Sequence, residues 1–247
     1  MSEAYRISFA SLCEGTVERL LADASGRDLL DVGSGTGALA RRAAAMGRVA
    51  VAVDADPDMA AMSATAVPGS VIEASLPDLP FGDDRFDAVT ANFVINHVDD
   101  PRAAMSELAR VLRPGGRMGA TIWTSDSPPW AALLRDVFGS AGVIPVPGQR
   151  LDPALDFERS VDGLAGLAEV AGLQTIIATQ LTWDWHISVD ALWAGVAGGV
   201  ATIGQTFVAQ TADVQCAAER AFRQATSRIS VDGMLRLPSS AAYVVAG

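Results

Sequence analysis

An apolar, strand-like stretch runs directly into three alternating glycines near residue 30. Residues 29–37 read LLDVGSGTG, and a helical pattern follows over 39–46. Glycines let the backbone turn sharply and approach a ligand closely, because they carry no Cβ atom. Gly33, Gly35 and Ala38 also satisfy the G-x-G-x-x-G/A spacing of dinucleotide-binding loops, so the spacing alone leaves a nicotinamide or flavin cofactor open.

The charge beside this loop favours one kind of ligand. Asp31 lies two residues before the first glycine. A carboxylate there would repel a pyrophosphate, whereas it would attract a ligand that carries an ammonium and a sulfonium group. We therefore expect S-adenosylmethionine rather than a dinucleotide.

A second acidic residue, Asp54, stands at the end of the next apolar run, 23 positions after Asp31. A carboxylate about 20 residues past such a loop is placed to accept hydrogen bonds from both ribose hydroxyls. A surface turn is the alternative role for Asp54. Asp56 directly precedes Pro57, so we expect it to cap a helix instead.

The chain has two histidines, and a histidine with a pKa near neutrality suits general base catalysis. His97 follows the fourth apolar run, which places it where doubly wound sheets bind ligands. It is the candidate catalytic base, with a structural or substrate-lining role as the alternative. For His186 a place in the rim or core of a later segment is favoured. Neither histidine has a partner at ligand spacing on a helix face, so we expect no metal site.

The elements that must position these residues alternate between strand and helix patterns. Short apolar runs predict strands over 29–32, 49–53, 71–72, 86–91 and 117–123. In Asp56-Pro57 and again in Asp100-Pro101, a capping carboxylate precedes a proline at the first helical position. This alternation predicts an α/β fold with a parallel sheet.

The regular alternation loosens after residue 123. We expect helices over 5–24, 129–140, 161–171, 189–200 and 208–229, and strands over 173–181 and 235–246. The length favours a single domain over 1–247. Its expected parts are an N-terminal helical cap (1–26), a cofactor-binding core (27–123) and a helical insertion (183–232) that forms a substrate cap.

Composition limits the partners. The 247 residues include 29 acidic and 18 basic ones, a net charge of −11. This excess of negative charge argues against nucleic acid and anionic membranes as partners. The first residues do not form a basic stretch followed by an apolar one, and no long apolar window occurs. We therefore expect a cytoplasmic protein without a membrane span. Cys13 and Cys216 fit reduced packing residues rather than a disulfide framework.

Five ordered motifs resemble the class I S-adenosylmethionine-dependent methyltransferases, and most closely the methyltransferase type 11-like branch that acts on small molecules and quinones. The motifs are DVGSGTG (31–37), VD (53–54), LPF with FDAV (79–81 and 86–89), FVINHV (93–98) and RVLRPGG (110–116). The resemblance covers residues 29–123. It implies a doubly wound, Rossmann-like sheet of seven strands whose last strand is antiparallel, with a helical insertion between the last two strands.

The resemblance also implies where the cofactor lies. Asp31 would lie near its ammonium group, and Asp54 would hold its ribose. The methionine moiety would lie against the glycine turn, lined by Gly33, Ser34, Gly35 and Gly37.

The adenine and methyl ends would meet other segments. Met59 would pack on the adenine, and Asn92 and Phe93 would face the methionine end and the methyl group. Where the family usually has an aspartate for the adenine amino group, this chain has Ser75, followed by Leu76. We expect that contact to be weakened rather than lost.

The substrate wall is expected from segments that the fold does not require. Aromatic side chains collect there and suit an apolar or aromatic acceptor. The candidate lining residues are Tyr5, Trp123, Trp183, Trp185 and His186, although the tryptophans can equally serve packing.

These expectations describe a methyltransferase that acts on an oxygen or nitrogen of a small, mostly apolar metabolite, in secondary metabolism. S-adenosylhomocysteine would be the product, and the protein would be a monomer or homodimer. Two alternatives stay open: a quinone-type carbon methyltransferase, and a protein that binds the cofactor without transferring its methyl group.

Overall fold

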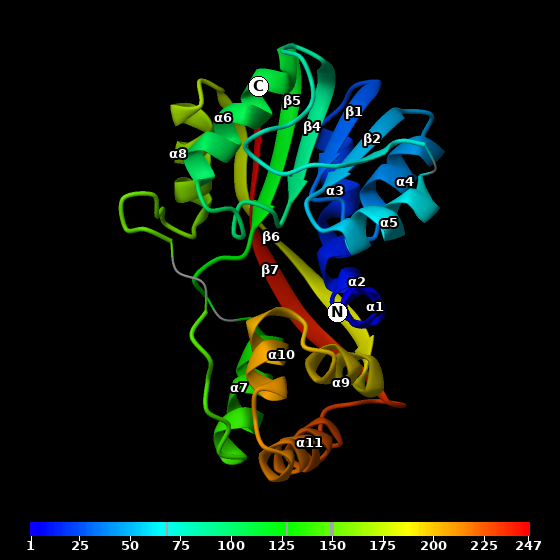
Figure 1. The fold of residues 1–247 in the computed structure, drawn as a ribbon, viewed down its shortest axis with the longest axis vertical. Helices are drawn as coiled ribbons and strands as arrows, with labels where there is room; N and C mark the ends of the chain where they lie inside the picture. Colours follow the sequence, from blue (N-terminus) through cyan, green and yellow to red (C-terminus); the bar gives the residue numbers. More distant parts are fainter. Residues whose placement is uncertain (68, 127, 149–150) are drawn as a thin grey trace. The chain divides into compact units, whose positions relative to one another are not determined.

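The computed structural model describes residues 1–67, 69–126, 128–148 and 151–247. Within these residues seven strands form one sheet in the order β3-β2-β1-β4-β5-β7-β6 (Figure 1). The strands are β1 Asp28–Val32, β2 Val49–Asp54, β3 Val71–Glu73, β4 Phe86–Asn92, β5 Leu112–Ile122, β6 Thr175–Ser188 and β7 Met234–Ala246. Strands β1 to β5 pair in parallel, and β7 pairs antiparallel to β5. The predicted fold class is confirmed.

The helices follow the local signals closely in the first half of the chain. Asp56 and Asp100 each accept hydrogen bonds from two backbone amides in the helical turn that follows, as predicted from the Asp-Pro pairs. The helices are α1 Ser2–Ile7, α2 Ala10–Cys13, α3 Val17–Asp23, α4 Ala38–Ala45, α5 Pro57–Ala66, α6 Pro101–Val111, α7 Pro129–Ser140, α8 Val161–Val170, α9 Val189–Ala197, α10 Ala201–Val208 and α11 Ala212–Thr226.

The chain divides into two compact units. The sheet unit comprises Thr16–Ser125, Leu151–Leu181 and Ser240–Gly247, and it contains strands β1 to β5 and the glycine turn. The helical unit comprises Met1–Gly15, Asp126–Arg150 and Thr182–Ser239, and it contains α1, α2, α7, α9, α10 and α11. Strands β6 and β7 have residues in both units.

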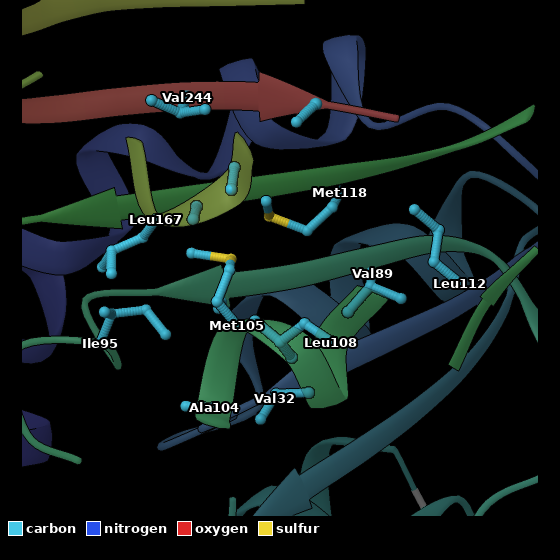
Figure 2. Close-up of a cluster of buried hydrophobic side chains, with 14 of the residues drawn as sticks. Val32, Val89, Ile95, Ala104, Met105, Leu108, Leu112, Met118, Leu167 and Val244 are labelled. Carbon is cyan, nitrogen blue, oxygen red and sulfur yellow. The ribbon is translucent and has the colours of Figure 1, made fainter. Parts of the chain in front are cut away.

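Apolar side chains cover both faces of the sheet unit. Figure 2 shows Met105 and Leu108 of α6 and Leu167 of α8 beside Val89 and Met118 of the sheet, all of them buried. Helices α3 and α4 pack on the opposite face (Figure 1). Leu30 and Val32 of β1 belong to the cluster under α6 and α8. Because successive side chains of a strand point to opposite faces, Asp31 between them points to the side of α3 and α4.

Several predicted boundaries are wrong, among them the following three. The helix expected over 5–24 is divided into α1, α2, a 3-10 turn and α3, because the backbone of Ser8 leaves the helical region after α1. The insertion expected from Trp183 begins only at α9, since β6 continues to Ser188. Burial alternates there, with Trp185 and Ile187 buried and Asp184 and His186 exposed, which is the pattern of a strand. The helix expected over 208–229 is the shorter α11, which begins only at Ala212 because α10 occupies the chain up to Val208.

Candidate functional site

The glycine turn joins β1 to α4 at the carboxyl end of the parallel strands. Gly33, Gly35 and Gly37 have φ values of 68°, 53° and 76°, in the region that residues with a Cβ atom rarely adopt. The amide of Ser34 donates to the carbonyl oxygen of Val53 at 2.9 Å, and the amide of Gly37 donates to that of Ser34 at 2.8 Å. The turn is therefore tied both to itself and to the end of β2.

Two of these glycines also make room for neighbouring segments of the protein. A Cβ atom on Gly33 would overlap Cγ2 of Val94, which follows β4. One on Gly37 would lie 2.8 Å from Oγ of Ser63 in α5. Close packing between elements is a known demand on the glycines of such loops. That the turn also lines a methionine moiety stays a prediction.

Asp31 is the buried acid of the site. It is 2% exposed, and its Oδ1 accepts a 3.1 Å hydrogen bond from Oγ1 of Thr90. Its Oδ2 is buried without a hydrogen-bond partner among the described residues. Burial raises the pKa of this carboxyl group to about 7, although the bond from Thr90 favours the charged form. Because buried polar atoms normally have partners, the free oxygen fits a ligand with a cationic donor, as an S-adenosylmethionine ammonium would be.

Asp54 braces the glycine turn. Its Oδ2 accepts a 2.7 Å hydrogen bond from the amide of Gly35, and its Oδ1 accepts a 3.0 Å bond from the amide of Asp56. A carboxylate offers about four lone pairs, so both oxygens can still accept bonds from ribose hydroxyls. The predicted ribose contact is thus compatible with the bonds that Asp54 already makes.

The residues predicted around the adenine follow β2 and β3. Met59 is half-buried in the first turn of α5, where its amide donates to Oδ1 of Asp56 at 3.3 Å. Ser75 is exposed, and its carbonyl oxygen accepts a bond from the amide of Asp78 at 3.0 Å. Leu76 packs against the apolar core of the sheet unit. The adenine roles of Met59, Ser75 and Leu76 stay predictions.

Asn92, the last residue of β4, connects three segments. Its Oδ1 accepts hydrogen bonds from the hydroxyl groups of Thr16 at 2.7 Å and Thr121 at 2.6 Å. Phe93 follows with a φ of 58°, and its amide donates to Oγ1 of Thr121 at 2.9 Å. The chain therefore leaves β4 in one defined direction, across the end of β5.

An aromatic pair stands at this edge of the sheet. The rings of Phe93 and Trp123 stack with their centroids 3.9 Å apart and their planes at 16°. Asn96 holds the backbone of Trp123, since its Oδ1 accepts from the amide at 2.8 Å and its Nδ2 donates to the carbonyl oxygen at 3.2 Å. Sequence reasoning missed Asn96 because its partner lies 27 positions away.

His97 directly follows Asn96 in the segment after β4. Its amide donates to the carbonyl oxygen of Val94 at 2.8 Å, and its side chain reaches the surface. Partial removal of the imidazole from water disfavours the charged imidazolium and lowers the pKa of His97 below 6.5. The imidazole is therefore neutral at pH 7, which is the form that can accept a proton.

The other predicted lining residues belong to the helical unit. Trp185 is 2% exposed and packs against both Phe9 and Trp130, with ring centroids 5.6 Å and 6.3 Å away. Its Nε1 donates to Oγ of Ser11 at 2.9 Å. This burial favours packing over substrate contact for Trp185.

Trp183, Tyr5 and His186 are more accessible. The indole of Trp183 stands over Gly15, where a Cβ atom would overlap it. Tyr5 is half-buried in α1, and His186 is exposed on β6. Their contact with a substrate, like that of Trp123 in the sheet unit, stays a prediction.

Two further observations concern the described part of the chain. No group of three histidine, cysteine or acidic side chains there is arranged to hold a metal ion. No single helix there is long and apolar enough to cross a membrane. Helices α9 and α10, which are bent by 67° against each other, reach that length and apolar character only when taken together.

Fold and site together define the class of protein. A seven-stranded doubly wound sheet with an antiparallel last strand, a glycine turn after β1 and an acid at the end of β2 form the class I methyltransferase fold. Residues 30–119 match the family model described as Methyltransferase domain. This part of the chain therefore resembles a methyltransferase domain, and the resemblance seen in the sequence is confirmed.

Similar proteins agree with this family. The demethylmenaquinone methyltransferase of Clavibacter sepedonicus is 39% identical over 104 residues, which cover 40% of this chain and 42% of that protein. The match thus spans less than half the length of this curated relative.

Solved structures share the fold. A candidate methyltransferase from Bacillus halodurans C-125 superposes with a TM-score of 0.58 at 16% identity, over 94% of this chain and 98% of that one. The [4+2]-cyclase SpnF superposes with a TM-score of 0.55 at 20% identity, over 95% and 80%. At these identities the likeness concerns the fold alone.

Proposed function

We propose that this protein is an S-adenosylmethionine-dependent methyltransferase that acts on an oxygen or nitrogen of a small, mostly apolar metabolite in secondary metabolism. One observation carries the choice of cofactor: Oδ2 of Asp31 is buried beside the glycine turn, with no hydrogen-bond partner among the residues that the structure describes. An ammonium group would satisfy that oxygen, whereas a pyrophosphate would be repelled by it. The methyltransferase domain match over 30–119 supports the same choice.

The residues of the site would have different roles in methyl transfer. When bound, the cofactor supplies a methyl group on a sulfonium, and S-adenosylhomocysteine is the product. Asp31 and the glycine turn would orient its methionine end, and Asp54 its ribose. The enzyme's main task is alignment and exclusion of water, for which Phe93 and Trp123 supply an apolar wall.

A proton must leave a hydroxyl acceptor as the new bond to the methyl group forms. His97 would accept that proton, a role supported by its position after β4 and by its lowered pKa. An amine acceptor needs only to arrive unprotonated, and His97 would then line the pocket. The stacked rings of Phe93 and Trp123 support an apolar or aromatic acceptor.

The same proposal describes the partners. The acidic balance of the chain, with a net charge of −11, supports a protein that binds a small molecule rather than nucleic acid. We place the protein in the cytoplasm, as a monomer or homodimer.

Two experiments, ligand binding first and product analysis second, test the proposal. S-adenosylhomocysteine should raise the melting temperature of the purified protein, whereas NAD⁺ and NADH should leave it unchanged. Mass spectrometry of co-purified small molecules would then suggest acceptors, which are incubated with deuteromethyl-labelled cofactor and searched for the label. Stabilisation by a nicotinamide nucleotide, with none by S-adenosylhomocysteine, would contradict the assignment.

Carbon methylation of a quinone is a second candidate, favoured by the likeness to the demethylmenaquinone methyltransferase of Clavibacter sepedonicus. A demethylmenaquinol probe tests it, because product NMR distinguishes a new ring-carbon methyl from a methoxy group.

A third candidate binds the cofactor without transferring its methyl group. The fold shared with the [4+2]-cyclase SpnF keeps this alternative open. Such a protein would bind S-adenosylhomocysteine yet never release it from S-adenosylmethionine with any acceptor tried.

A further inference from the structure

Asp31 and Thr90 are neighbours in the parallel ladder between β1 and β4. One row of registered residues crosses the sheet at this level, from Ala52 through Asp31, Thr90 and Gly119 to Val245. Residues in register on adjacent strands point to the same face. Thr90 is therefore the one hydroxyl-bearing neighbour of Asp31 in this row.

The hydroxyl group of Thr90 is committed to this place. Thr90 is completely buried, and its Oγ1 lies 3.1 Å from Oδ1 of Asp31 and 3.3 Å from the carbonyl oxygen of Leu30. Valine has the same branched shape without the hydroxyl group. A buried hydroxyl costs free energy unless it is hydrogen-bonded, so packing alone gives no reason for threonine here.

The bond divides the two oxygens of Asp31 between protein and ligand. Oδ1 is held by Thr90, and Oδ2 has no partner among the described residues. A carboxylate fixed through one oxygen presents the other in a defined direction. We propose that Thr90 is a positioning residue for cofactor binding, which orients the carboxylate of Asp31 and keeps it ionised for a cationic ligand. This inference rests on the proposed function.

The electrostatic surroundings of Asp31 set the sign of the effect. Burial raises its pKa to about 7, and the negative charge of Asp54 on β2 acts in the same direction. The bond from Thr90 and the amide of Ala40 in α4 act in the opposite direction. Asp54 is the only charged side chain in the described structure that contributes to this shift.

Loss of the hydroxyl group therefore has a pH-dependent consequence. Without Thr90 Oγ1 the pKa of Asp31 rises further, because a bond to its charged form is lost. Near neutral pH a larger fraction of Asp31 is then protonated, and its attraction for an ammonium group disappears. Raising the pH ionises the carboxyl group again and restores the attraction.

The test compares Thr90→Val and Thr90→Ser by calorimetric titration with S-adenosylhomocysteine from about pH 6 to about pH 7.5, below the ordinary pKa of about 7.7–8.0 of an α-amino group. We expect Thr90→Val to bind about tenfold more weakly at the acid end and to approach the wild type at the alkaline end. Thr90→Ser keeps the hydroxyl group and should follow the wild type throughout. Asp31→Asn should bind weakly without this pH dependence.

A matched control removes another buried threonine hydroxyl. Thr226 is 1% exposed, and its Oγ1 donates to the carbonyl oxygen of Phe222 within α11. Thr226→Val should leave the pH profile of binding unchanged. Thermal unfolding of each variant shows whether the fold is retained.

Two results would overturn the inference about Thr90. One is a Thr90→Val profile that coincides with that of the wild type, and the other is a weakening by the same factor at every pH, which would indicate packing alone. A ¹³C NMR titration of the Asp31 carboxyl group supplies an independent measurement, in which Thr90→Val must raise the midpoint. If wild-type protein binds no S-adenosylhomocysteine, the proposed function fails, while this titration still decides whether Thr90 tunes Asp31.

Discussion

The amide of Gly35 donates a 2.7 Å hydrogen bond to the carboxylate of Asp54, so the glycine turn after β1 is held by the last residue of β2. The same carboxylate accepts a bond from the amide of Asp56, which caps α5. The acid predicted to hold the ribose therefore also shapes the loop on which the cofactor would lie. Binding and loop geometry are coupled through one side chain.

Asp54→Ala should abolish detectable binding of S-adenosylhomocysteine in calorimetry. The substitution removes both the predicted ribose acceptor and the brace on Gly35. Glu169→Ala, which removes an exposed negative charge from α8, is the control and should bind normally. Wild-type affinity in Asp54→Ala would refute the ribose assignment.

Asp31→Asn should stabilise the protein at alkaline pH relative to acid pH. The pKa of Asp31 is about 7 in the folded protein, against an ordinary value of 3.8. Its contribution to stability is therefore fully present below the ordinary value and is lost as the pH rises through 7. The difference amounts to at most about 4.5 kcal/mol at about 1.4 kcal/mol per pK unit.

Urea unfolding of wild type and Asp31→Asn at about pH 4 and about pH 8 measures this difference. The stability gained by the variant should be larger at the higher pH. A gain of equal size at both pH values would show that the carboxyl group is not protonated preferentially in the folded state.

His97→Gln should lower the turnover of a hydroxyl acceptor by about 10² or more, because the proton acceptor is lost. Since the pKa of His97 lies below 6.5, the wild-type rate should fall only as the pH drops through that lower value. The release of S-adenosylhomocysteine measures both effects. An unchanged rate in the variant would leave His97 as a lining residue.

Asn96→Ala should destabilise the protein by about 1–3 kcal/mol, because the amide and the carbonyl oxygen of Trp123 both lose a partner. Gln180→Ala, which truncates an exposed amide on β6, is the control. Both are compared with the wild type by urea unfolding. Equal midpoints for the two variants would show that the Asn96 bonds add nothing to stability.

Gly37→Ala and Gly47→Ala separate strain from crowding. Both glycines have left-handed backbones, with φ values of 76° and 82°. A Cβ atom on Gly47 would meet open space, whereas on Gly37 it would crowd Ser63 and Ala66 of α5. Each variant should lose about 1–2 kcal/mol to backbone strain, and Gly37→Ala about 1–3 kcal/mol more to crowding. Equal losses in thermal unfolding would show that α5 shifts to accommodate the new methyl group without a measurable cost in stability.

Local features were predictable from the sequence because they depend on adjacent residues. The Asp-Pro pairs at 56–57 and 100–101 begin α5 and α6, and the glycine turn follows β1 as predicted. The extension of β6 to Ser188 had a signal as well, since Trp183, Trp185 and Ile187 alternate with polar residues. That period of two was outweighed by the expectation of a helical insertion.

The sequence by itself determined the order of strands and helices, the glycine turn and the acids at the ends of the first two strands. Only the tertiary structure decided which residues meet across the sheet. Asp31 and Thr90 are 59 positions apart, and Asn96 and Trp123 are 27 positions apart. Such pairs arise because the order of the strands within the sheet and their register bring distant residues to one level, and no spacing along the chain specifies either.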